Sequence, residues 1–212
     1  SPTAGSFRLV LDADTFSEPF TGALFIAFAS EGEPREAMHA WVGAPPVLRF
    51  DLQGVAGEVV LRVEDAAAHA PADWSAVAPG DEWLVQAVAR RNRTGRSAGK
   101  GAGDVYGESK RITYVPDSDS VATLHLDRVV EERPFPETDR VVLFEFVSPS
   151  LSEFHGFEYT LRAGVRLPRS FGERDTHPVV YSVTGFGGTH TSILQWNRRV
   201  DAESPLDDCL LV

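Results

Sequence analysis

The first part of the chain consists of short apolar segments separated by clusters of Pro and Gly. Seven such segments follow one another, at residues 7–11, 23–29, 47–52, 59–63, 83–89, 109–115 and 121–126. The third, VLRFDL, alternates apolar and polar side chains, which is the period of a half-buried strand. No long amphipathic helical pattern interrupts the series. Regularly spaced short strands with polar turns predict an antiparallel β-sandwich of immunoglobulin-like type over residues 1–130.

A charged, proline-containing segment follows the last of these strands. Residues 131–139 have the sequence EERPFPETD, which combines two prolines with no hydrophobic periodicity. This composition is typical of an exposed connection between domains. We therefore predict a linker at 131–139 and a second domain over residues 140–212.

The second domain shows a different order of elements. Two longer strands are predicted at 141–147 and 159–167, followed by a buried strand at 179–183, a short helix at 191–199 and a further strand at 209–212. Two strands followed by a strand–turn–helix–strand unit is the opening order of an α/β-hydrolase sheet. The sequence therefore predicts the first strands and helix of an α/β-hydrolase fold after the sandwich.

The turn after the predicted buried strand is rich in glycine and contains Gly185, Phe186, Gly187 and Gly188. Glycine adopts positive φ angles and lets a ligand approach the backbone closely. Two adjacent backbone N–H groups at such a turn can stabilise a developing oxyanion. The same turn is compatible with a tight strand-to-helix connection that has no chemical role, and the sequence leaves both possibilities open.

The motifs around this turn are similar to those of a known family. The segment VRLP at 165–168 matches a family pattern V-x-L-P, HPVVY at 177–181 matches YPVVY, and TGFGG at 184–188 matches His-Gly-x-Gly-Gly. On these motifs, residues 151–212 resemble α/β-hydrolase esterases of the enterochelin-esterase and feruloyl-esterase type, or esterase D type. The chain departs from the family at Thr184, where a loop-orienting histidine is usual.

The resemblance implies serine acyl-transfer chemistry, in which a serine attacks an ester, a histidine acts as base and an acidic residue orients the histidine. It implies that the backbone N–H groups of Phe186 and Gly187 form the oxyanion hole, and that Gly185, Gly188 and His190 contact the substrate. A small-molecule or carbohydrate ester is the expected substrate, with no cofactor and no metal. The triad cannot be assigned within these residues, so we expect the chain to be the N-terminal part of such an esterase.

The apolar segment 209–212 predicts a central parallel strand beside residues 179–183. Such a strand needs a neighbour and a covering layer, because open apolar edges promote aggregation. We expect the remainder of the hydrolase domain, as a second fragment, or another copy of the chain to cover it. The alternative function is a non-catalytic binding or spacer module with a degenerate esterase-like end. Trp41 and Trp74 lie in loop-like segments and make carbohydrate a candidate ligand, whereas Trp83 is predicted to be core.

One segment matches a catalytic sequence motif but lacks the strand–turn–helix arrangement that the motif requires. Residues 95–99, GRSAG, fit the nucleophile-elbow pattern G-x-S-x-G. An elbow serine lies on a strained turn between a strand and a helix, whereas the segment after Gly99 is too rich in glycine to continue as a helix. We therefore predict that Ser97 lies in an exposed, flexible loop with no histidine within hydrogen-bonding distance.

The composition argues against several other kinds of function and site. The net charge of -11 argues against nucleic acid as a partner, and no apolar run approaches the roughly 20 residues of a membrane span. The pairs Asp12/Asp14 and Asp117/Asp119 are interpreted as turn formers in preference to calcium ligands, and the histidines show no zinc-type spacing. Cys209 is the single cysteine, which excludes an internal disulfide. The start at Ser1, without Met, fits a removed signal peptide and fits an engineered start for expression equally well. We expect a secreted or periplasmic bacterial protein.

Overall fold

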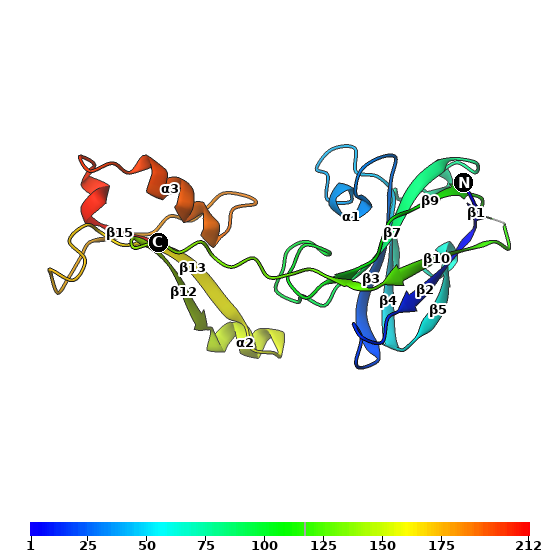
Figure 1. Cartoon of the computed structure of the whole chain (residues 1–212), viewed down its shortest axis with the longest axis horizontal. Helices are drawn as coiled ribbons and strands as arrows, with labels where there is room; N and C mark the ends of the chain where they lie inside the picture. The colour runs from blue at the N-terminus through cyan, green and yellow to red at the C-terminus, as the bar shows by residue number, and fades with distance from the viewer. Residues whose placement is uncertain (117) are drawn as a thin grey trace. The chain divides into compact units, whose positions relative to one another are not determined.

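The computed structural model describes residues 1–116 and 118–212, and it divides the chain into two compact units (Figure 1). Unit 1 comprises Ser1–Glu132 and unit 2 comprises Arg133–Val212. Each unit has its own hydrophobic core. Phe135, which lies in the segment predicted as a linker, packs against the core of unit 2.

Unit 1 is built from two β-sheets. The larger sheet has the strand order β1-β9-β7-β3-β4-β6, with β8 pairing to both β7 and β11. Its strands are β1 (Thr3–Ala4), β3 (Phe20–Ala29), β4 (Val47–Val55), β6 (Ala68–Ala70), β7 (Glu82–Ala89), β8 (Val105–Tyr106), β9 (Lys110–Tyr114) and β11 (Arg128–Val129). The smaller sheet has the order β10-β2-β5, with strands β2 (Ser6–Leu11), β5 (Glu58–Arg62) and β10 (Val121–Leu126).

Each of the seven segments predicted from the sequence contains a strand, so this prediction is confirmed. Among the described residues of unit 1, helical structure is limited to the single turn α1 (Pro34–Ala37) and the 3₁₀ turns η1 (Val63–Asp65) and η2 (Trp74–Ala76). The unit is therefore β-rich and sandwich-like.

The core of unit 1 follows from the alternation of side chains along the strands. In β4, Leu48, Phe50 and Leu52 point inward while the residues between them are exposed. Alternate residues of β2 and β10 do the same from the smaller sheet. The ring of Phe7 meets the ring of Phe28 edge-on at 5.9 Å, joining the two sheets. Period-two alternation thus places one apolar face of each sheet against the other.

The prediction of purely antiparallel sheets is wrong at the N-terminus. The strand β1 pairs in parallel with β9 of the larger sheet, and β2 then pairs in parallel with β10 of the smaller sheet. The change of sheet occurs at Gly5, where a Cβ would lie 2.6 Å from the carbonyl oxygen of Pro116. Only glycine allows so close an approach to that backbone. The two sheets are therefore mixed, because the first strand lies beside later strands that run in the same direction.

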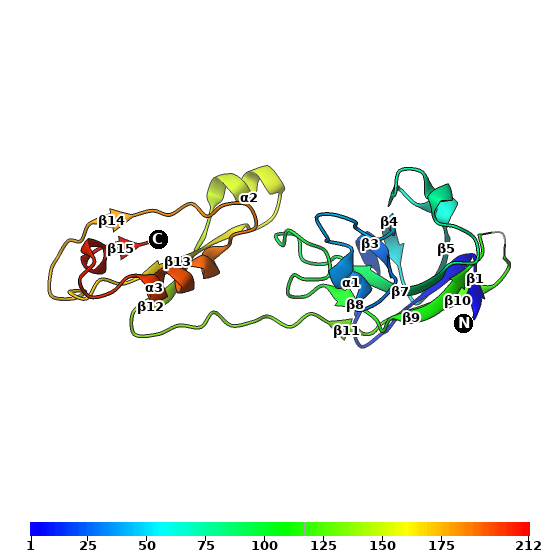
Figure 2. The same cartoon turned by 90° about the horizontal axis from the view of Figure 1, so that it is seen from above.

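Unit 2 contains one sheet of order β12-β13-β15-β14. The two longer strands predicted from the sequence are present as β12 (Val141–Val147) and β13 (Thr160–Arg166), and the structure pairs them as an antiparallel hairpin. The strand β15 (Leu210–Leu211) lies between β13 and β14 (Val179–Val180), and it is parallel to β14. Between β14 and β15 come the 3₁₀ turn η3 (His190–Ser192), α3 (Ile193–Arg199) and the 3₁₀ turn η4 (Pro205–Asp208). Figure 2 shows α3 alongside β13.

A helix that the sequence analysis did not predict connects the two hairpin strands. It is α2 (Pro149–His155), which lies at the end of the β12–β13 hairpin (Figure 1). The hydroxyl of Ser148 accepts a hydrogen bond from the N–H of Leu151, and Gly156 ends the helix at φ 69°. An N-cap serine, a proline at the first helical position and a C-terminal glycine are the usual signals of a short helix.

The predicted pairing of residues 209–212 with the strand at 179–183 is confirmed, but that strand is neither long nor buried. Regular pairing covers only Val179 and Val180, and both side chains are exposed. Val183, predicted as part of the strand, is 96% exposed. The reason is position, because β14 is the edge strand of the sheet and has a hydrogen-bonded neighbour on one side only.

The helices of the described residues are all short. The longest, α2 and α3, have seven residues each, and no helix in the described part of the chain is long and apolar enough to cross a membrane.

Candidate functional site

The glycine turn is held at the end of the β14–β15 ladder. Beyond the two paired residues, the N–H of Val212 donates to the carbonyl oxygen of Val180 at 2.9 Å. The N–H of Ser182 donates to the carbonyl oxygen of Val212 at 2.6 Å. These bonds fix the backbone that leads into the turn, so the turn follows the carboxyl end of a parallel strand.

The turn itself is a closed β-turn over Gly185–Gly188. The N–H of Gly188 donates to the carbonyl oxygen of Gly185 at 2.9 Å, and Gly187 has φ 85°. Positive φ at the third residue is the requirement of a type II turn, which explains glycine at this position. The side chain of Phe186 is 80% exposed, and the N–H of Gly187 has no hydrogen-bond acceptor among the described residues. That N–H is therefore available to a ligand.

Gly188 is required for a separate reason. A Cβ at this position would lie 2.3 Å from the Cβ of Thr184, closer than any real pair of such atoms. Thr184 thus packs directly against the backbone that closes the turn. This is the position at which the chain differs from the esterase motif, and here the threonine fills the space beside the turn by contact.

The helical segment after the turn begins at a capped 3₁₀ turn. The hydroxyl of Thr189 accepts a hydrogen bond from the N–H of Thr191 at 3.3 Å, which is the role of an N-cap. The first residue of η3 is His190, and its ring lies 5.6 Å from that of Phe135. Beneath it, Gly164 of β13 leaves no room for a side chain, because a Cβ there would lie 2.3 Å from the carbonyl oxygen of His190.

A cavity of about 270 Å³ lies between the turn's flanking segments, β13 and α3. Its walls include both polar and apolar groups, among them Arg162, Tyr181, Thr184, His190, Ile193 and Trp196. The Nε of Arg162 lies 2.7 Å from Oε1 of Glu145 on the neighbouring strand. Burial lowers the pKa of the His190 imidazole, and the charge of Arg162 lowers it further, against the opposing charge of Glu145. His190 is therefore a neutral imidazole at neutral pH.

The five predicted site residues are close together in sequence, but only one of them lines the cavity. His190 is part of the cavity wall, whereas Gly185, Phe186, Gly187 and Gly188 form the exposed turn between two wall segments. The arrangement can donate a backbone hydrogen bond at the turn and offer a neutral imidazole close by. Sequence reasoning missed Gly164 and Arg162, for which no local signal exists. It could have found the cap at Thr189 from its position before the helix.

No nucleophile is assembled at this site. Among the described residues, no histidine ring is hydrogen-bonded to a serine, threonine or cysteine side chain. Ser97 lies in a loop of unit 1 with no helix after it, as predicted, although its side chain is partly buried and not exposed. The nearby His39 donates from Nε2 to the carbonyl oxygen of Ala98 at 2.7 Å, and not to the hydroxyl of Ser97.

The loop that contains Ser97 is organised by one buried carboxylate, which the prediction of a flexible loop did not foresee. Asp104 is 1% exposed. Its Oδ1 accepts from the N–H groups of Arg91 and Asn92 at 2.8 and 2.7 Å. Its Oδ2 accepts from the N–H groups of Gly99 and Gly101 at 2.8 and 3.3 Å. The glycines of this loop therefore serve its folding around Asp104.

The acidic pairs considered for calcium can be described in part. Oδ1 of Asp12 accepts a hydrogen bond from the N–H of Asp14 at 2.9 Å, the geometry of an aspartate turn. Asp117 lies outside the described residues. Within the part of the chain that the structure describes, no group of three His, Cys, Asp or Glu side chains is placed to hold a metal ion.

Comparison of the chain with protein-family models, with curated proteins and with solved structures finds no match.

Proposed function

We propose that this chain supplies the oxyanion-hole strand and an accessory β-sandwich to a serine-esterase-like α/β-hydrolase. The observation that carries the proposal is the parallel β14–turn–α3–β15 unit, in which a closed glycine turn follows the carboxyl end of β14. A turn at this point presents backbone N–H groups at the place where acyl-transfer enzymes stabilise negative charge. The motifs VRLP and HPVVY before the turn add support from sequence.

In this proposal the N–H groups of Phe186 and Gly187 donate to the oxyanion of a tetrahedral intermediate. The type II geometry supports the role of Gly187, since the turn is closed by the N–H of Gly188 and the N–H of Gly187 has no acceptor among the described residues. Gly185 and Gly188 keep the backbone accessible to the substrate. The neutral ring of His190 hydrogen-bonds an uncharged ester, and the 270 Å³ cavity beside it receives one of the ester's substituents. No triad residue is assigned within this chain.

The proposal is tested by removing one N–H while keeping the turn. Phe186→Pro deletes the backbone donor at a position of the type II turn where proline is favoured. Phe186→Ala removes the same exposed side chain but keeps the N–H, so it is the matched control. Both variants are made in the protein expressed from its complete gene, and hydrolysis of p-nitrophenyl butyrate and of methyl ferulate is measured. Loss of one oxyanion donor lowers kcat about 10²-fold or more.

The expected result is a large fall in kcat for Phe186→Pro and little change for Phe186→Ala. Equal activity of the two variants would show that the N–H of Phe186 takes no part in catalysis. If the unaltered protein hydrolyses neither ester and is not labelled by a fluorophosphonate serine-hydrolase probe, the proposal fails. That outcome favours the alternative function, a non-catalytic binding or spacer module.

A further inference from the structure

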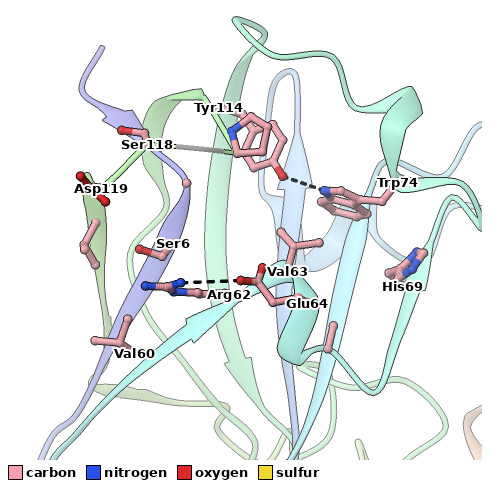
Figure 3. Close-up of a pocket in the computed structure, with 14 residues that line it drawn as sticks. Ser6, Val60, Arg62, Val63, Glu64, His69, Trp74, Tyr114, Ser118 and Asp119 are labelled. Carbon is pink, nitrogen blue, oxygen red and sulfur yellow. Dashed lines mark hydrogen bonds and ion pairs between the residues drawn. The ribbon is translucent and has the colours of Figure 1, made fainter.

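Unit 1 contains a cleft that the esterase proposal does not use. Its volume is about 650 Å³, within the range of sites that hold small-molecule ligands. It opens where the chain passes from one sheet to the other at Gly5, and its other walls include residues of β5, β6, β9, β10, η1 and η2. Figure 3 shows Trp74 and His69 on one side, Ser6 and Asp119 on the other, and the Arg62–Glu64 pair between them.

The aromatic side of the cleft is fixed in place before any ligand arrives. Nε1 of Trp74 donates to the phenolic oxygen of Tyr114 at 2.9 Å, and the Trp74 ring packs edge-on against Phe28 at 5.5 Å. The ring of His69 lies 5.7 Å from that of Trp74, and its Nδ1 lies 2.8 Å from the carbonyl oxygen of Pro71. A ring held by a hydrogen bond and by contacts with other rings loses little entropy when a ligand covers its remaining surface.

The polar groups of the cleft are accessible and nearly balanced in charge. The guanidinium of Arg62 lies 3.8 Å from the carboxylate of Glu64, and these side chains are 66% and 69% exposed. Asp119 adds one further carboxylate on the opposite side. Ser6 adds a hydroxyl group to the wall of the cleft, although the residue as a whole is only 8% exposed. Donors and acceptors therefore alternate across the cleft without a strong net charge.

These features select one class of ligand. An anionic ligand is disfavoured, because the single guanidinium is already paired and Asp119 is negative. A metal ion lacks a group of three suitable ligands in the described residues. A purely apolar ligand would cover the Ser6 hydroxyl and part of the Arg62–Glu64 pair without replacing their hydrogen bonds to water, which is costly. A neutral polyhydroxylated ligand satisfies both donors and acceptors and covers aromatic rings with its C–H faces.

We propose that the cleft bounded by Ser6, Arg62, Glu64, His69 and Trp74 is a binding site for a neutral saccharide. The site is independent of the esterase proposal, because it lies wholly in unit 1 and requires no catalysis. The hydroxyl groups of the saccharide would be bound by the Arg62–Glu64 pair and Ser6. One face of a sugar ring would lie against Trp74 and His69. The aromatic side would thus contact the C–H groups of the sugar, and the polar side would hydrogen-bond its hydroxyl groups.

The test is calorimetric titration of the whole chain with cellohexaose, xylohexaose and mannohexaose. A hexamer of galacturonic acid serves as the charged comparison. The double variant Arg62→Ala/Glu64→Ala removes the polar pair without leaving an unpaired charge. The matched control is Arg8→Ala/Glu58→Ala, which removes an exposed ion pair of similar length, 3.9 Å, from the same sheet outside the cleft.

We expect at least one neutral hexasaccharide to bind, and to bind at least about tenfold more weakly to the cleft variant than to the control, a difference of about 1.4 kcal/mol. Trp74→Phe keeps a ring against Phe28 but removes the indole N–H and part of the ring surface, so it should also weaken binding. The proposal is overturned if no neutral saccharide binds, if only the acidic hexamer binds, or if the two double variants bind equally. Because the readout is heat of binding, its failure leaves the esterase test unaffected.

Discussion

Gly164 and the carbonyl oxygen of His190 are in direct contact across unit 2. A Cβ built on Gly164 would lie 2.3 Å from that oxygen and 2.4 Å from Cγ2 of Ile193. Residue 164 therefore sets how closely η3 and the start of α3 approach β13. His190 lines the cavity of the candidate site. The width of that cavity therefore depends on the absence of a side chain at Gly164 of β13.

Gly164→Ala is expected to destabilise unit 2. The obstructing atom is a backbone oxygen that cannot rotate away, so the cost should reach the upper part of the range for overpacking, about 2–3 kcal/mol. Gly185→Ala is the control, because no atom lies within 4 Å of its Cβ position and its φ is not positive. Urea unfolding can be followed by fluorine NMR of 5-fluorotryptophan, in which Trp196 reports on unit 2. Equal unfolding midpoints for the two variants would contradict this account.

Asp207→Asn is expected to be more damaging than Asp208→Asn. The carboxylate of Asp207 is hydrogen-bonded to Arg166, whose side chain is 1% exposed, and it also accepts from Arg140 at 2.7 Å. Removing the negative partner leaves a buried guanidinium unpaired, which costs about 3–5 kcal/mol. The pair between Asp208 and Arg174 is exposed, so its loss should change stability far less. The ranking is checked by the same Trp196 signal.

The stability of unit 2 is expected to fall at acidic pH through Asp207. Hydrogen bonding from Arg166 lowers the pKa of the Asp207 carboxyl, an effect larger than the opposing effect of burial, and Arg140 lowers it further. A depressed pKa in the folded state means that the stabilisation is present at neutral pH, and it is lost as pH falls below about 5. Urea unfolding at a series of pH values should show this slope. Asp207→Asn should flatten it, whereas Asp208→Asn should retain the part due to Asp207.

Asp104→Asn is expected to loosen the loop that contains Ser97. The substitution replaces one of two accepting oxygens with an NH₂ group that faces backbone donors. Loss of hydrogen bonds to a charged acceptor, with donors left buried, costs about 3 kcal/mol. Hydrogen–deuterium exchange of peptides covering 91–104 should accelerate. Asp51→Asn, which removes an exposed ion pair to Arg49, is the control, and unchanged exchange in both variants would refute the prediction.

The parts of the fold that sequence predicted are those with local signals. The alternation of Leu48, Phe50 and Leu52 with polar residues defines β4 without knowledge of its neighbours. The parallel pairing of β1 with β9 and of β2 with β10 has no local signal, because each strand pairs with residues more than a hundred positions away. The helix α2 had a clear local signal in Ser148, Pro149 and Gly156, and it could have been predicted.

The same distinction applies to the candidate site. The need for glycine at position 187 follows from the turn, and sequence indicated it. The roles of Gly164 and Asp104 depend on contacts with distant backbone, for which no pattern in the sequence gives evidence. The exposure of Val179 and Val183 could not be predicted either, because an apolar run does not reveal whether its strand lies at the edge of a sheet.

The parallel pairing of β2 with β10 determines how unit 1 responds to mechanical force. Six residue pairs, from Ser6↔Val121 to Leu11↔Leu126, align the first long strand of the unit with one of its last. Tension applied between the two ends of the unit pulls these adjacent strands in opposite directions along their length. The hydrogen bonds between them are then sheared together and not broken one after another. A sandwich tethered through both of its ends would therefore resist extension through this ladder.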